Sequence, residues 1–205
     1  MSRVFAVIVA VEGPSAAGKT TWCRATGLQF VAEYAPTGSE PDGSEQAAYW
    51  VSVNSQRWAQ ALKLEDSTGA AVCDSDPLKL HYSWCLAAVG AAPFARFEHE
   101  LAAVRGAFAQ NRLGFPDVVL LSIPDARQLA AQRIGDQTRR RRHFDLHARL
   151  SEPLAEWYAA VERLDRGRVV DGFPSALDLD AVAIPRPDRH DMDLLDALVD
   201  ELPPL

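Results

Sequence analysis

The sequence predicts an α/β fold, in which helices cover both faces of a doubly wound, five-stranded parallel sheet. Three observations support this prediction. Strand-like and helix-like segments alternate along the 205 residues, as they do in βα units. Residues 4–11 are apolar without interruption, which is typical of a strand buried on both faces. A glycine-rich turn and a helix-forming segment follow this strand directly.

The five expected strands are short, apolar and mostly β-branched. They are residues 4–11, 28–33, 70–73, 118–123 and 168–171. The expected helices fill the intervals, and right-handed crossovers place them on both faces of the sheet. They are residues 19–26, 44–66, a segment opened by Pro77, residues 94–110, residues 125–134 and a stretch that ends near Leu164. Ser44 is the expected N-cap of the long second helix, after a loop at residues 37–43.

The length of the chain suits one domain. We expect residues 1–182 to form this domain and residues 183–205 to form an acidic tail docked on it. Apolar residues recur in the tail at helical spacing, which predicts a short amphipathic helix. They are Leu194, Leu195, Leu198, Val199 and Leu202.

Composition argues against several classes of function. The net charge of −7 opposes nonspecific binding to nucleic acid or to anionic lipid. The longest apolar run has eight residues, which is too short to span a bilayer, and no cationic leader precedes it. Cys23, Cys73 and Cys85 have neither metal-type spacing nor an even number. We therefore expect a cytoplasmic protein whose cysteines are small core residues.

The turn after the first strand matches the pattern GxxxxGK[ST], a phosphate-binding loop. Its glycines permit a tight turn, and successive N–H groups and the positive end of the next helix then face the phosphates. Lys19 is expected to contact the β- and γ-phosphates, and Thr20 to bind Mg²⁺. The residues expected to contact the nucleotide are Gly13, Ser15, Ala16, Ala17, Gly18, Lys19, Thr20 and Thr21.

Four segments of the chain resemble the P-loop nucleoside and nucleotide kinases, broadly the thymidylate kinase and deoxynucleoside kinase group. They are residues 13–21, residues 30–36, residues 73–76, and residues 121–125 with the arginines that follow. The resemblance implies a P-loop kinase fold and phosphoryl transfer that depends on ATP and Mg²⁺. It implies a small-molecule acceptor, most often a nucleoside or a nucleoside monophosphate, and it leaves a homodimer open.

The resemblance also implies an arginine-bearing lid at about residues 134–146, in which Arg139 and Arg141 act on the transferring group. Arg133, just before it, would contact the nucleotide. Planar guanidinium groups suit this task because they stabilise the spreading negative charge. Arg139, Arg140, Arg141 and Arg142 are consecutive, so on a helix only one or two would face the site. A solvated basic face and a nucleic-acid patch are the alternatives, and the net negative charge disfavours the second.

Three acidic residues follow predicted strands, at the sheet edge where ligands bind in open α/β folds. The resemblance implies that Glu33 is the base that orients the acceptor hydroxyl and takes its proton, while Asp74 supports Mg²⁺. The residues alone leave these roles exchangeable among Glu33, Asp74 and Asp76. Strand-end solvation of Glu33 and helix capping by the two aspartates are the structural alternatives.

One departure from the family pattern concerns Ser75. The group usually has an arginine after the acidic residue of the third strand, and that arginine commonly contacts the phosphate of the acceptor. This chain has Ser75 there, which weakens the case for a monophosphate acceptor unless Arg57 or Arg96 substitutes.

The long second helix carries a candidate acceptor surface. Trp50, Asn54, Arg57 and Trp58 are spaced i, i+4, i+7 and i+8, so they share one face. With Tyr34, this face offers rings and hydrogen-bonding groups for a flat substrate. An aromatic core face with polar edges is the competing interpretation.

A small-molecule kinase is the leading hypothesis. Within this class, the acceptor could instead be another hydroxylated metabolite or a natural product. A nucleotide-dependent switch or regulatory ATPase is the alternative from another class, and a degenerate binding module is a third. The sequence lacks an Asp-x-x-Gly pattern directly after a predicted strand and lacks an Asn-Lys-x-Asp pattern, both of which a GTPase switch would need.

Overall fold

The central sheet has five strands, and every neighbouring pair is parallel. The computed structural model describes residues 6–124, 146, 149–175 and 185–205. The strands are β1 (Val7–Glu12), β2 (Phe30–Val31), β3 (Ala70–Asp74), β4 (Val118–Leu121) and β5 (Val169–Asp171). Their order across the sheet is β2-β3-β1-β4-β5, so β1 lies in the middle. The prediction of a five-stranded parallel sheet is therefore confirmed.

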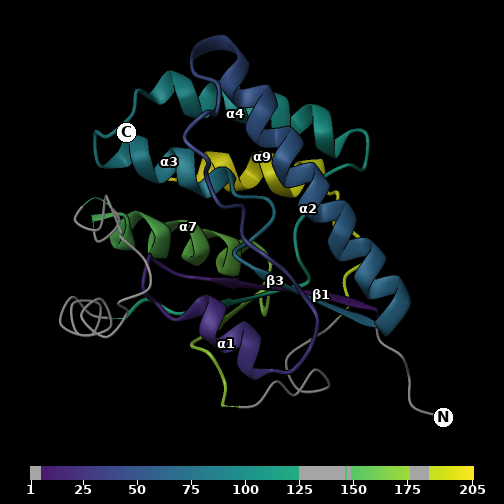
Figure 1. The fold of residues 1–205 in the computed structure, drawn as a ribbon. Helices are drawn as coiled ribbons and strands as arrows, with labels where there is room; N and C mark the ends of the chain where they lie inside the picture. The colour runs from purple at the N-terminus through teal and green to yellow at the C-terminus, as the bar shows by residue number, and fades with distance from the viewer. Residues whose placement is uncertain (1–5, 125–145, 147–148, 176–184) are drawn as a thin grey trace.

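Helices cover both faces of this sheet (Figure 1). One face carries α1 (Lys19–Ala25), which lies against β1 and β3. The other helices of the described residues lie beyond the other face. They are α2 (Gln46–Thr68), α3 (Leu80–Ala88), α4 (Phe94–Phe108), α7 (Ser151–Leu164) and α9 (Met192–Glu201). A short 3₁₀ turn, η1 (Gly43–Glu45), leads into α2.

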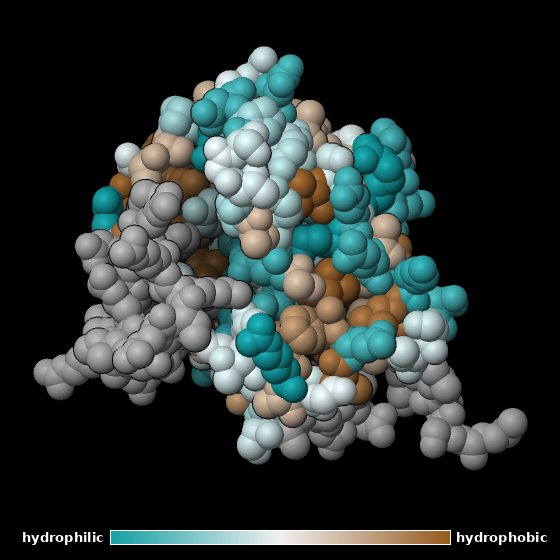
Figure 2. All heavy atoms as spheres, in the orientation of Figure 1, coloured by the Kyte–Doolittle hydropathy of each residue, from teal (hydrophilic) through white to brown (hydrophobic). Residues whose placement is uncertain are grey.

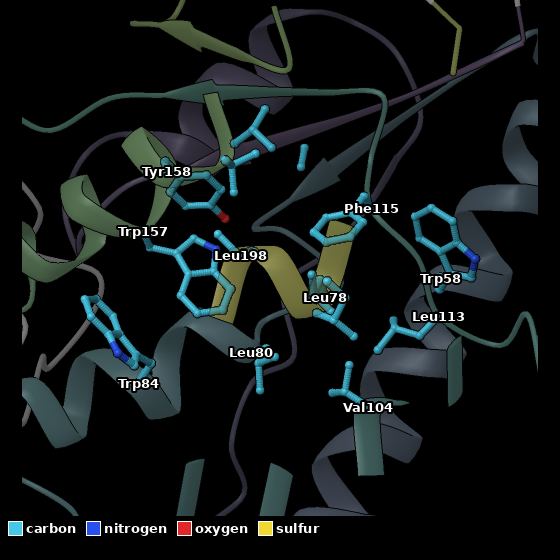
Figure 3. Packing of buried hydrophobic residues seen from close by; sticks show 14 of the residues in the cluster. Trp58, Leu78, Leu80, Trp84, Val104, Leu113, Phe115, Trp157, Tyr158 and Leu198 are labelled. Atoms are coloured by element: carbon cyan, nitrogen blue, oxygen red, sulfur yellow. The ribbon is translucent and has the colours of Figure 1, made fainter. Parts of the chain in front are cut away.

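Alternate residues of β1 serve the two faces, as the pleat of a strand requires. Ile8 and Ala10 belong to the large core under α2, α3, α4, α7 and α9. Val7, Val9 and Val11 belong to smaller clusters that Trp22 of α1 covers. Figure 3 shows the aromatic part of the large core, where Trp58, Trp84 and Trp157 are almost fully buried. Residues 7–11 of the strand are therefore all apolar, because neither face of the strand meets water.

Two helix starts differ from the sequence prediction. Helix α2 begins at Gln46, and its N-cap residue is Glu45 without a side-chain cap bond, so Ser44 is not the cap. Helix α3 begins at Leu80 and not at Pro77. The chain first turns because the Asp76 carboxylate accepts the N–H of Leu78 at 2.9 Å. Lys79 then has a left-handed backbone with φ 50°. The expected helix at residues 125–134 lies outside the described residues.

The C-terminal helix α9 is amphipathic, as its leucine spacing predicts. Leu195 and Leu198 are completely buried in the same core as Trp157. Asp191 caps the helix by accepting the N–H of Leu194 at 3.0 Å. Helix α9 packs against α7.

A second anchor of the tail lies at the amino ends of β1 and β4. Asp117 accepts the N–H of Ile8 at 2.6 Å and the N–H of Arg186 at 2.7 Å. Arg189 lies 2.5 Å from both Asp117 and Glu65. These two carboxylates raise the pKa of Arg189, although burial alone would lower it. The tail network, as we call Asp117, Arg186, Arg189 and Glu65, therefore ties the C-terminal segment to the sheet and to α2.

The surface of the protein and the burial of its cysteines can be compared with what the composition predicts. Hydrophilic and hydrophobic groups are interspersed over the coloured part of the face drawn in Figure 2. None of the described helices is both long and apolar enough to cross a bilayer. Cys23, Cys73 and Cys85 are buried free thiols, and burial raises the pKa of Cys23 and of Cys73 to about 12. The prediction that the cysteines are core residues is confirmed.

Candidate active site

The phosphate-binding loop connects the end of the central strand β1 to the start of α1. Gly13 is required by packing, because a Cβ there would lie 2.2 Å from the carbonyl oxygen of Ser122 beyond β4. Gly18 is the N-cap of α1 with φ 90°, and Ala16 also has a positive φ of 80°. The loop thus wraps closely over the sheet edge and leads directly into a helix amino terminus, which favours anion binding.

Lys19 lies folded over its own loop. Its ammonium donates to the carbonyl oxygen of Gly13 at 2.6 Å and lies 3.7 Å from the carboxylate of Glu12. The side chain is 10% exposed. A cation held at the mouth of the loop is available to a polyphosphate bound there.

Thr20 and Asp74 form a second polar pair beside the loop. The hydroxyl of Thr20 donates to Asp74 Oδ2 at 2.6 Å. Asp74 Oδ1 is buried and, among the described residues, has no hydrogen-bond partner. Burial raises the pKa of Asp74, and the hydrogen bond from Thr20 opposes that shift. A hydroxyl and a carboxylate are oxygen ligands of the kind Mg²⁺ takes alongside phosphates and water, so these two residues fit that ion.

Glu12 is a central residue that the sequence reasoning missed. It is 2% exposed and accepts hydrogen bonds from the Gly13 N–H at 2.9 Å, the Ser75 hydroxyl at 2.6 Å and the Asp76 N–H at 3.0 Å. Burial would raise the pKa of Glu12, but nearby Lys79, His81 and Lys19 together hold it well below its usual range. The residue is therefore a buried anion around which the cations of the site are arranged.

Lys79 is the second residue that the sequence reasoning missed. Its ammonium donates to Glu33 Oε1 at 2.8 Å and to the hydroxyl of Ser75, and it lies 3.7 Å from Glu12. Burial would raise the pKa of Glu33, but Lys79 and then Lys19 lower it to about 2. The structure thus places the predicted base in an ion pair with Lys79.

A buried hydrogen-bonded chain lies behind Glu12. The Tyr158 hydroxyl of α7 donates to Asp76 Oδ2 at 2.9 Å and lies 3.3 Å from Nδ1 of His81. His81 Nε2 is 3.5 Å from Glu12. Burial lowers the pKa of His81 to about 4, so the ring is neutral near pH 7. Burial raises the pKa of Asp76 to about 6, and Glu12 adds to this shift. Asp76 is therefore a buried residue that supports the candidate site from behind Glu12.

Arg57 does not line the candidate crevice as an open cation. Its guanidinium donates to carbonyl oxygens at the ends of β2 and β3 and is almost fully buried. The acceptors are Ala32 at 3.0 Å, Asp74 at 2.7 Å, Ser75 at 2.7 Å and Asp76 at 3.4 Å. Arg96 likewise pairs with Glu100 at 3.0 Å. Of the two arginines that the sequence offered for an acceptor phosphate, Arg57 is thus committed to backbone carbonyls, whereas Arg96 makes a partly exposed pair through its Nε.

The predicted acceptor face of α2 divides into two parts. Trp50 is partly exposed, and its ring meets those of Tyr34 at 5.5 Å and Tyr49 at 5.2 Å, edge to face. Asn54 is 8% exposed and donates to the Leu78 carbonyl at 3.5 Å. Trp58 is completely buried beside Leu113 and Phe115 (Figure 3). Periodicity placed these residues on one face correctly, but the core covers Trp58, so the structure corrects its predicted substrate role.

The predicted lid residues are not part of the described structure. Arg133, Arg139 and Arg141, with the rest of the arginine-rich run, lie outside the described residues. The described part of the site therefore consists of the phosphate-binding loop and of side chains at the ends of β1, β2 and β3.

Comparison with solved structures identifies the fold. Deoxyadenosine kinase from M. mycoides with bound dCTP has a TM-score of 0.56 and 13% identity, over 95% of this chain and 100% of that one. The same enzyme with bound dATP gives a TM-score of 0.56 at 13% identity, over 93% and 98% of the two chains. The NadR protein in complex with NR gives a TM-score of 0.54 at 18% identity, over 97% of this chain but 52% of that one.

These similarities define the chain as one with the P-loop nucleoside kinase fold. No protein-family model and no curated protein sequence matches it. The expected resemblance to deoxynucleoside kinases is thereby confirmed at the level of the fold.

Proposed function

We propose that the protein is a small-molecule kinase, which transfers the terminal phosphoryl group of ATP to a hydroxyl group of a nucleoside. One observation carries this proposal: Lys19, the Thr20–Asp74 pair and Glu33 lie at the carboxyl ends of three adjacent strands. This combination provides a phosphate cation, oxygen ligands for a metal and a carboxylate base in one place.

Each residue has a distinct role in the proposed reaction. When bound, Mg²⁺-ATP supplies an electrophilic phosphorus and an ADP leaving group. Glu33 orients the acceptor hydroxyl and takes its proton as the new O–P bond forms and the bond to ADP breaks. Lys19 stabilises negative charge on the phosphates, while Thr20 and Asp74 hold the metal. Arg139 and Arg141 remain the proposed lid arginines, and Arg133 the proposed nucleotide contact.

The acceptor we favour is an uncharged nucleoside over a monophosphate. Arg57 is used by four backbone carbonyls, and Arg96 is paired with Glu100. Arg57 is therefore not free to bind an acceptor phosphate, while Arg96 is engaged through its Nε. The partly exposed rings of Tyr34, Tyr49 and Trp50 offer apolar edges for a flat base. We assign this activity to the cytoplasm, where ATP is available and buried free thiols stay reduced.

The test is ADP formation from Mg²⁺-ATP with nucleosides, nucleoside monophosphates and unrelated hydroxylated metabolites as acceptors. We expect a nucleoside to stimulate ADP formation. The Lys19→Ala variant should lose at least about 100-fold in kcat, because a charge-stabilising donor is removed from the transition state. Lys63 is exposed on α2, so Lys63→Ala is the matched control and should keep full activity.

Other results would redirect the assignment. Stimulation by another hydroxylated metabolite or natural product would change the acceptor class but keep the kinase. ATP binding without any acceptor-dependent turnover would favour a nucleotide-dependent switch or regulatory ATPase. Normal turnover by Lys19→Ala would remove the phosphate-binding loop from the mechanism.

A further inference from the structure

We infer that Lys79 is a positioning residue that acts through Glu33, by keeping this carboxylate ionised and fixing the direction of one of its oxygens. The inference deepens the proposed function and rests on it, since Glu33 is a base only in that proposal. Three kinds of observation support it: the contacts of the pair, the backbone that presents Lys79, and the charges around Glu33.

The contacts leave one oxygen of Glu33 available. Among the described residues, Lys79 is the hydrogen-bond donor to Glu33, and the bond goes to Oε1 at 2.8 Å. The Glu33 side chain is 38% exposed and that of Lys79 24%, whereas Glu12 behind them is 2% exposed. Oε2 of Glu33 is therefore the atom that an acceptor hydroxyl would meet, with its direction set by the bond at Oε1.

The backbone around Lys79 is strained in a way that serves this contact. Ser75 and Lys79 are not glycines, yet both are left-handed, with φ 69° and φ 50°. Such conformations are disfavoured for residues that carry a Cβ and persist when the surroundings hold them. Ser75 donates its N–H to Val11 at 2.9 Å and its hydroxyl to Glu12. It also accepts a hydrogen bond from Lys79, so the strained turn delivers the ammonium to a fixed place.

The charges around Glu33 make Lys79 the dominant cation. The titratable groups that face it are Lys79, His81 and Tyr82 near the start of α3, Lys19 of α1, Glu12 of β1 and Asp74 of β3. Lys19 would remain if Lys79 were removed, but Glu12 and Asp74 would then repel the Glu33 carboxylate. Loss of Lys79 should accordingly raise the pKa of Glu33 toward or above that of an ordinary glutamate.

The first experiment compares the pH dependence of kcat for wild type, Lys79→Met and Lys79→Arg, with Lys63→Met as the matched control. We expect the ratio of the Lys79→Met rate to the wild-type rate to rise several-fold between pH 4 and pH 6, because over this range Glu33 ionises in the variant but is already ionised in wild type. The KM for ATP should change less than kcat, and Lys79→Arg should restore the flat ratio.

A role in folding alone would give a different pattern. It would lower the rate of Lys79→Met by the same factor at every pH, and this outcome would overturn the inference. A loss of kcat in Lys63→Met as large as that in Lys79→Met would also overturn the inference. Lys79→Arg keeps the charge, so a pH-dependent loss in that variant would also contradict the role assigned to the ammonium.

A second measurement does not depend on finding the acceptor. The Glu33 carboxyl signal, assigned by its absence in Glu33→Gln, is titrated by ¹³C NMR in wild type and in Lys79→Met. We expect the pKa to rise by more than one unit when Lys79 is removed, and an unchanged pKa would refute the inference. If wild type transfers phosphate to no acceptor, the proposed function fails, and this titration still decides whether Lys79 controls Glu33.

Discussion

Networks of charged residues lie at both ends of the sheet. They contain similar residue types, but they differ in whether their acceptor oxygens are already hydrogen-bonded. At the amino end, both oxygens of Asp117 accept two hydrogen bonds each, from Ile8, Arg186 and Arg189. At the carboxyl end, Asp74 Oδ1 has no partner among the described residues, and Glu33 is more than one third exposed. A buried group of charges is therefore a poor marker of a site by itself. Unused acceptors beside an opening are the better marker.

The two networks also differ in their backbone. Ser75 and Lys79 at the carboxyl end are left-handed without being glycine. No residue of the tail network has a positive φ in the described structure. Strain is tolerated where a side chain has to reach a particular point, whereas the tail network needs only to hold two segments together. This contrast predicts that mutations in the tail network change stability, whereas mutations of Lys19, Glu33 or Lys79 at the carboxyl end change activity.

The largest expected effect on stability comes from Asp117→Ala. This change leaves the partly buried guanidinium of Arg189 with one carboxylate and removes the acceptor of the Ile8 N–H. We expect a loss of about 3–5 kcal/mol in the free energy of unfolding, measured by urea denaturation. The kcat of the remaining folded protein should be unchanged. A variant of normal stability but low kcat would contradict the division between the two ends.

A medium effect is expected from Asp76→Asn, and it depends on pH. The pKa of Asp76 is about 6 in the folded protein, above its ordinary value of 3.8. The folded state thus binds a proton that the unfolded state has released, so the contribution of Asp76 to stability falls as the pH rises from about 4 to 6.

The asparagine variant has no such dependence. Relative to wild type, its free energy of unfolding should increase by about 1 kcal/mol between pH 5 and pH 6.5. Urea denaturation at these two pH values provides the measurement. A constant difference between the two proteins would mean that Asp76 is ionised throughout, with its charge balanced by Arg57 or by groups behind it.

The smallest effect is expected from Asp196→Ala, which also serves as the control for Asp117→Ala. Asp196 of α9 pairs with Arg105 of α4 at 2.6 Å, but both side chains are more than 40% exposed. We expect a loss below about 1 kcal/mol that decreases in high salt. A loss as large as that of Asp117→Ala would show that the surface pair secures the C-terminal segment as strongly as the tail network does.

The sequence was sufficient to predict the elements whose signals are local. The apolar run at β1 predicted the buried central strand, and the sequence from Gly13 to Thr20 predicted the phosphate-binding loop. The leucine spacing predicted α9. Helix α3 began three residues later than predicted, because the Asp76 carboxylate and the left-handed Lys79 form a turn that no propensity indicates.

The missed site residues depend on contacts distant in sequence. Glu12 ends an apolar strand, and its importance appears only when Ser75 and Lys79 meet it from the neighbouring strand end. Trp58 and Arg57 show the converse. Helical spacing predicts that they share a face with Trp50, but it cannot predict that the core and four carbonyl groups cover that part of the face.

Arg57 has a consequence for how this site can evolve. Its guanidinium holds the ends of β2 and β3 through the carbonyl oxygens of Ala32, Asp74, Ser75 and Asp76, which every amino acid possesses. Substitutions at these four positions would change the side chains at this end of the sheet without removing the acceptors that Arg57 requires. The positions of the two strand ends can therefore be kept while the side chains around the candidate site change.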